Sequence, residues 1–84
     1  MTENNKERLY CLVSEVLGVP IRDVNEDSSP DSITNWDSLS HLNLVLALET
    51  EFGVSLSIED VTEMLSVRLI RMILTQYGVA GLDS

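Results

Sequence analysis

The order of apolar and polar residues predicts a first helix that ends near residue 17. Leucine and valine residues recur there at the three- and four-residue spacing of one helix face. The stripe consists of Leu9, Leu12, Val13, Val16 and Leu17. Gly18 and Pro20 follow it, and a glycine with a nearby proline is typical of a helix end. Cys11 falls on the face opposite the stripe, so its side chain is expected to be exposed.

The helical pattern then fails from Val19 to Asp37, a segment that contains both prolines of the chain and several polar turn residues. This segment predicts a long loop. A long loop within a small domain is usually functional or held in place by its own apolar residues. The candidates for such anchoring are Val19, Ile21, Val24, Ile33 and Trp36.

Two further helices are expected directly after the loop. The second helix of the chain should run from about Ser38 to Phe52 and end at Gly53. Whether Ser38 only caps this helix or has another role is left open by the local pattern, since serine and aspartate are both common at helix starts. Ser57 and Asp60 have the spacing of a capping pair, which predicts a short third helix ending near Leu65.

The fourth helix is expected to begin after Ser66 and to end at Gly78. Its apolar stripe consists of Val67, Ile70, Ile73, Leu74 and Tyr77. Apolar residues alternate over 54–58 as in a strand, but a single strand would have no partner. The chain is therefore predicted to be all-α, a four-helix bundle with a long first loop and a short third helix.

The second helix has too many apolar residues for one face. A stripe along its whole length is expected to face the core, and consists of His41, Leu44, Val45, Leu48 and Phe52. A shorter stripe begins just after Ser38 and consists of Leu39, Leu42 and Leu46. The short stripe fits either a docking surface beside the serine or a second buried face of a central helix.

The length of 84 residues predicts one domain that spans 1–84 and buries about 60–65% of its unfolded surface. The folded part is expected over about 6–78, with flexible ends over 1–5 and 79–84. The net charge of −9 argues against nucleic acid and anionic membranes as partners, and favours proteins with basic docking patches. A monomer is expected.

The remaining composition favours a cytoplasmic protein. The single cysteine cannot form an internal disulfide, and the chain does not open with a charged leader and apolar core. No segment approaches the roughly 18 apolar residues needed to span a bilayer.

The second helix and its start resemble a known family. Asp37-Ser38-Leu39 stands at the start of that helix and is followed by Leu-Val-x-Ala-Leu-Glu-x-Glu-Phe. The triplet is a weak pattern alone, but with the helix order, loop length, size and acidity it resembles the acyl carrier proteins and their carrier-domain relatives. The resemblance extends from about Glu7 to Gly78.

The resemblance implies that Ser38 is the attachment point of a 4′-phosphopantetheine arm, joined by a phosphopantetheinyl transferase through a phosphodiester. The terminal thiol of the arm would then carry acyl or aminoacyl groups as thioesters. Acyl-loading, acyl-transferring and condensing enzymes would be the partners, and the chain itself would not be an enzyme. A helix start suits this role, since its free N–H groups and positive dipole end favour a phosphate.

Several positions depart from the fatty-acid-synthesis members of that family. Asn35-Trp36 replaces the usual Gly-Ala before the triplet, and Ser40, Asn43 and Thr50 stand where acids are common. These departures favour a stand-alone carrier of a specialised pathway, such as polyketide, modified-lipid, aminoacyl or polysaccharide-linked biosynthesis. The residues expected to recognise partners are Asp37, Leu39, Leu42, Leu46 and Glu49.

Three other functions are weaker alternatives. The chain could be an unmodified acidic helical module that docks onto basic partners. Ser38 and His41 suggest a hydrolase, but the chain has no G-x-S-x-G turn and little material for an oxyanion hole. Asp23-x-Asn25-x-Asp27 imitates a calcium loop without its glycine and final glutamate, so no metal site is expected.

Overall fold

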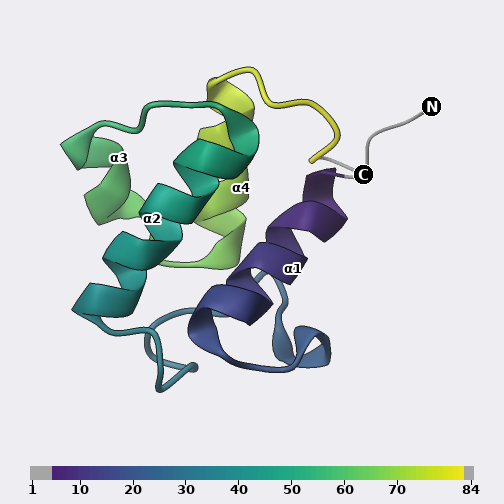
Figure 1. The fold of residues 1–84 in the computed structure, drawn as a ribbon, viewed down its shortest axis with the longest axis vertical. Helices are drawn as coiled ribbons and strands as arrows, with labels where there is room; N and C mark the ends of the chain where they lie inside the picture. The colour runs from purple at the N-terminus through teal and green to yellow at the C-terminus, as the bar shows by residue number, and fades with distance from the viewer. Residues whose placement is uncertain (1–4, 83–84) are drawn as a thin grey trace.

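The computed structural model, described for residues 5–82, confirms the all-α fold. The elements are α1 (Asn5–Leu17), a 3-10 turn η1 (Ile21–Asp23), α2 (Ser38–Phe52), α3 (Ile58–Glu63) and α4 (Val67–Gln76). In the view of Figure 1, α2 lies between α1 and α3, with α4 behind it, and the long loop from α1 to α2 runs below. None of the helices within 5–82 is long and apolar enough to cross a membrane.

Local signals set the helix boundaries as the sequence predicts. The hydroxyl of Ser57 accepts a hydrogen bond from the Asp60 N–H, and the Asp60 carboxylate accepts one from the Ser57 N–H, which forms a capping box at α3. The Ser66 hydroxyl caps α4 by accepting a hydrogen bond from the Leu69 N–H. Gly53 ends α2 with a left-handed φ of 67°. The second helix therefore has the predicted bounds, and α3 ends two residues before the predicted Leu65.

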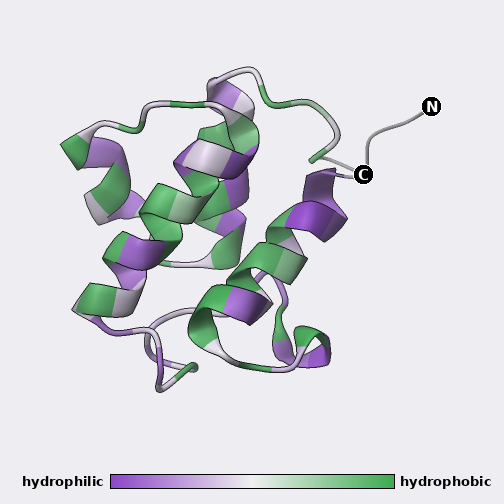
Figure 2. Ribbon diagram, in the orientation of Figure 1, coloured by the Kyte–Doolittle hydropathy of each residue, from purple (hydrophilic) through white to green (hydrophobic). Residues whose placement is uncertain are grey.

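The two apolar stripes of α2 have different environments. Leu44, Val45 and Leu48 of the long stripe are buried in the common core, and His41 and Phe52 are half-buried. The short stripe is at the surface, with exposed fractions of 70% for Leu39, 55% for Leu42 and 61% for Leu46. Figure 2 shows green apolar segments at several turns of α2. The alternative in which both stripes are buried is therefore wrong.

The α4 stripe is buried except at its end. Its first four members belong to the core, but Tyr77 is 40% exposed, which corrects the prediction for that residue. Tyr77 follows the last helical residue, Gln76, and its hydroxyl donates a hydrogen bond to the Asp60 carboxylate instead of entering the core. Cys11 is exposed, as predicted.

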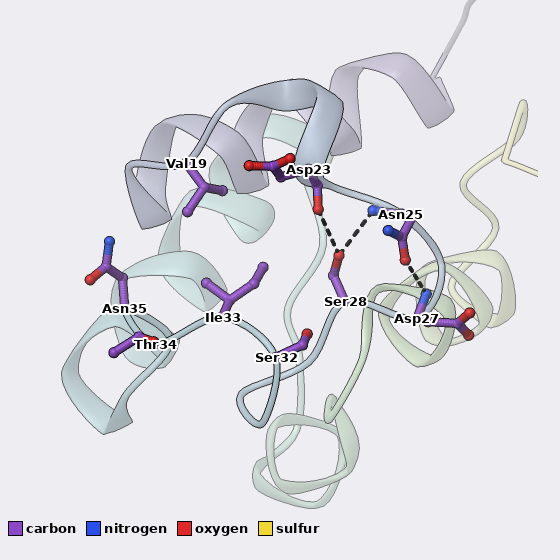
Figure 3. A pocket seen from close by; sticks show the side chains of 9 residues that line it. All are labelled: Val19, Asp23, Asn25, Asp27, Ser28, Ser32, Ile33, Thr34 and Asn35. Atoms are coloured by element: carbon purple, nitrogen blue, oxygen red, sulfur yellow. Dashed lines mark hydrogen bonds between the residues drawn. The ribbon is translucent and has the colours of Figure 1, made fainter.

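The long loop is held by buried apolar residues and by its own hydrogen bonds. Val24, Ile33 and Trp36 are buried and Val19 is half-buried, but Ile21 is 45% exposed because it begins the surface turn η1. The prediction that Ile21 anchors the loop is therefore wrong. Figure 3 shows how Ser28, itself buried, secures the loop.

Ser28 and its neighbours connect the loop to the helices. The Ser28 hydroxyl accepts from the Asn25 N–H and donates to the Asp23 carbonyl, and the Ser28 carbonyl accepts from the N–H of Val67 at the start of α4. The Asn35 amide donates to the Leu17 carbonyl at the end of α1. The loop is therefore fixed at both helices before it reaches Trp36.

The segment after α4 packs against the start of α1, although its residues were expected to be flexible. Leu82 is 1% exposed, and the Asn5 side-chain amide donates to the Ala80 carbonyl over 2.6 Å. The Lys6 N–H donates to the Gly81 carbonyl. The packed part thus includes Asn5 and residues 79–82, and the rest of the predicted flexible ends, 1–4 and 83–84, lies outside the described residues.

Candidate functional site

Ser38 is the first residue of α2, and its side chain is at the surface. The preceding residue, Asp37, has an extended conformation and caps the helix, since its carboxylate accepts a hydrogen bond from the Ser40 N–H over 2.9 Å. Asp37 therefore performs the capping role that the sequence left open between the two residues. The Ser38 hydroxyl is not required for it.

The capping hydrogen bond also sets the charge at the helix start. The hydrogen bonds from Ser40 lower the pKa of Asp37 below its ordinary value. Asp37 is thus a carboxylate at neutral pH, and it already occupies the Ser40 amide of the first turn. A phosphate on Ser38 would share the positive end of the α2 dipole with this carboxylate, which reduces the advantage expected from the helix start alone.

Trp36, His41 and Val61 form a connection that the sequence analysis missed, which we call the His41 bridge. The indole N–H of Trp36 donates to Nδ1 of His41 over 2.9 Å, and Nε2 of His41 lies 2.9 Å from the Val61 carbonyl oxygen. An indole nitrogen can only donate, so Nδ1 accepts and Nε2 carries the proton that is donated to Val61. The bridge joins the loop, α2 and α3.

The signals for this bridge were present but not decisive. His41 is the single histidine and the polar member of an otherwise apolar stripe, and Trp36 is the single tryptophan. Both were interpreted as apolar packing residues. The partner on α3 is a backbone carbonyl twenty residues further along, and a backbone acceptor leaves no mark in the sequence.

A recess opens beside Ser38 between the end of the loop, the first turn of α2 and α3. Its lining is mainly apolar, with the Asp37 carboxylate at its edge. The residues that line it are Pro30, Trp36, Asp37, Ser38, His41, Val61, Thr62 and Leu65. We call it the Ser38 recess. The hollow drawn in Figure 3 is a separate one, formed by the loop itself, and Ser38 does not line it.

The predicted recognition residues are only partly brought together. Leu39, Leu42 and Leu46 are exposed on α2, and we call them the leucine patch. Glu49 lies three residues beyond Leu46, but its carboxylate accepts a hydrogen bond from the Leu56 N–H over 2.9 Å. Glu49 therefore supports the link between α2 and α3, a role that the sequence did not suggest.

The comparison with protein families matches most of the chain. A family model described as a phosphopantetheine attachment site matches residues 7–70. The matched range begins in α1 and ends within α4, so it includes the whole long loop, Ser38, the leucine patch and the His41 bridge.

Proposed function

Because this chain belongs to the phosphopantetheine-attachment family, that of the acyl carrier proteins and their relatives, we propose that Ser38 is the residue that bears its arm. The family carries 4′-phosphopantetheine covalently, and its domains interact with phosphopantetheinyl transferases and are generally not catalytic. The observation that supports Ser38 is its position: an exposed hydroxyl on the first residue of α2, next to an aspartate that already caps the helix.

Three other serines are less suitable for modification. Ser57 and Ser66 use their hydroxyls to cap α3 and α4, and the Ser28 hydroxyl is engaged in the loop and buried. Modification of any of these would remove a hydrogen bond that holds the fold. Ser38 offers its hydroxyl without that cost.

Attachment requires only that Ser38 be accessible, since the transferase supplies the chemistry. The Ser38 oxygen forms a bond to phosphorus as the diphosphate bond of coenzyme A breaks, adenosine 3′,5′-bisphosphate leaves, and the serine proton passes to the transferase. The bound arm supplies a thiol that carries acyl or aminoacyl groups as thioesters. The chain's own residues position the attachment point: Asp37 starts the helix, and the buried Trp36 fixes the loop before it.

We also propose that 1–84 acts as one carrier domain of a specialised biosynthetic pathway rather than of housekeeping fatty-acid synthesis. The residues Ser40, Asn43 and Thr50, where acids are common in the fatty-acid members, support this. Basic partner enzymes would recognise the leucine patch and Asp37, with Glu49 contributing charge while it holds the α2–α3 link. An apolar surface of this kind lowers the dependence of docking on ionic strength.

The experiment is intact mass spectrometry after incubation with coenzyme A and a promiscuous phosphopantetheinyl transferase. We expect the wild-type chain to gain the mass of one arm and Ser38→Ala to gain none. Ser55→Ala, which removes an exposed serine in the α2–α3 link, is the matched control and should be modified like the wild type. A labelled Ser38→Ala protein would refute the assignment, and an unlabelled wild type would favour the unmodified docking module.

A further inference from the structure

The His41 bridge lies between the Ser38 recess and the packed interior of the bundle. His41 lines the recess, and the next residues on the same face of α2, Leu44 and Leu48, are both 0% exposed. Met64, which follows Val61 on the α3 side, is also 0% exposed. His41 therefore lines the recess on the helix face that continues into the apolar core.

Both ring nitrogens of His41 are engaged, one with the loop before α2 and the other across the seam between α2 and α3. One holds the indole of Trp36, which is 3% exposed, and the other holds the Val61 carbonyl. An apolar group moving from Ser38 into the core would have to part α2 from α3 at Val61. It would break the bond between His41 and the Val61 carbonyl, and turning the imidazole aside would also leave the indole N–H of the buried Trp36 unpaired, which is costly.

We propose that the His41 bridge is a seal that confines the carried group to the outer Ser38 recess and excludes it from the core between α2 and α3. This inference rests on the proposed attachment of the arm at Ser38. In this proposal His41 is a positioning residue, because it determines where the carried group can lie. A compact acyl group would be covered by Pro30, Val61 and Leu65 at the recess, while a long chain would extend from it into water.

The test compares the wild-type chain with His41→Ala, each loaded through coenzyme A derivatives with either the bare arm or an octanoyl arm. Intact mass confirms loading. NMR spectra then report the indole N–H of Trp36 and the methyl groups of Val61 at the recess, against the methyl groups of Leu44 and Leu48 in the core. The bare arm is the control for effects of attachment alone.

In the wild type, the octanoyl group should shift the Trp36 and Val61 signals and leave those of Leu44 and Leu48 in place. In His41→Ala, the shifts should extend to Leu44 and Leu48. Core shifts in the wild type as large as in the variant would overturn the proposal, and so would a loaded variant whose core signals do not move.

Trp36→Phe provides a second variant in case His41→Ala does not fold, because it removes the indole donor but keeps an aromatic ring. The imidazole then loses the bond that orients it toward Val61, so the octanoyl group should again reach the core, and unmoved core signals there would count against the seal. A failure of the proposed function gives a different result from a failure of the seal. A wild-type chain that gains no arm mass would reject attachment itself, whereas a loaded wild-type chain with core shifts as large as those of the variant would reject only the seal.

Discussion

The two stripes of α2 allow a paired test of what its outer leucines do. Leu46 and Leu48 are two residues apart on one helix, yet Leu46 is 61% exposed and Leu48 is 0% exposed. Replacing each with alanine removes the same atoms from the same helix. Any difference in the effect on stability must therefore come from the environment of the side chain.

The expected magnitudes follow from burial. Removing the fully buried Leu48 side chain should lower the free energy of unfolding by about 2–5 kcal/mol, since it loses its transfer energy and leaves a cavity. Leu46 has only about two fifths of its surface covered, so at most about 1 kcal/mol of the roughly 2 kcal/mol for a buried leucine is at stake. The higher helix propensity of alanine offsets part of that loss.

Urea denaturation gives the unfolding free energies, and turnover by a phosphopantetheinyl transferase gives recognition. Leu46→Ala should remain nearly as stable as the wild type while kcat/KM for the transferase falls by about fivefold, equivalent to roughly 1 kcal/mol at an interface. Leu48→Ala should lose stability, with turnover preserved in the fraction that stays folded. Equal destabilisation by both substitutions, or unchanged turnover for a stable Leu46→Ala, would refute the assignment of the leucine patch to docking.

Four further predictions concern stability. Partial burial raises the pKa of Glu26, but the hydrogen bonds from Tyr10 and Arg71 outweigh it, so the pKa is lowered in the folded protein. The stability that the Glu26 carboxylate contributes should therefore be lost as pH falls through its folded-state pKa. Glu26→Gln should flatten the acid limb of a stability–pH curve. Burial and the bond to Glu26 raise the pKa of Tyr10 to about 12, so stability should also fall as pH rises from 10 to about 12. Tyr10→Phe should reduce that fall, and the pKa of Tyr77, which its bond to Asp60 also raises, accounts for a remaining part. Glu49→Ala should cost about 1 kcal/mol in urea denaturation because it unties the Leu56 N–H, and no loss would mean that this bond is unimportant. At a net charge of −9, the midpoint of thermal unfolding should rise between low and physiological ionic strength, and a flat or falling midpoint would show that charge repulsion is not significant.

The helices could be predicted because their signals are local. The glycine at 53 and the serine caps at 57 and 66 act within a few residues of the ends they define, and the apolar stripes repeat along single helices. The division of α2 into a buried and an exposed stripe could be posed from the sequence but not resolved. Which stripe is covered depends on where α1, α3 and α4 lie, and that is a property of the whole bundle.

The errors at Leu82 and Tyr77 share one cause, which is contact between distant parts of the chain. Leu82 is buried because the start of α1 receives it, through a bond from Asn5 to a carbonyl 75 residues away. Tyr77 has helical spacing, but its hydroxyl finds Asp60 at the surface. Periodicity indicates which residues share a face but contains no information about such partners.

At the functional site, too, the sequence does not show which distant residues are in contact. The sequence places Ser38 at a helix start, and the family match includes that position, yet neither indicates what surrounds the serine. His41 has the spacing of a core residue, but its two nitrogens hold a loop side chain and an α3 carbonyl, so a residue expected to fill the interior instead bounds it. On the proposal above, this residue limits where a carried group can lie without taking part in attachment.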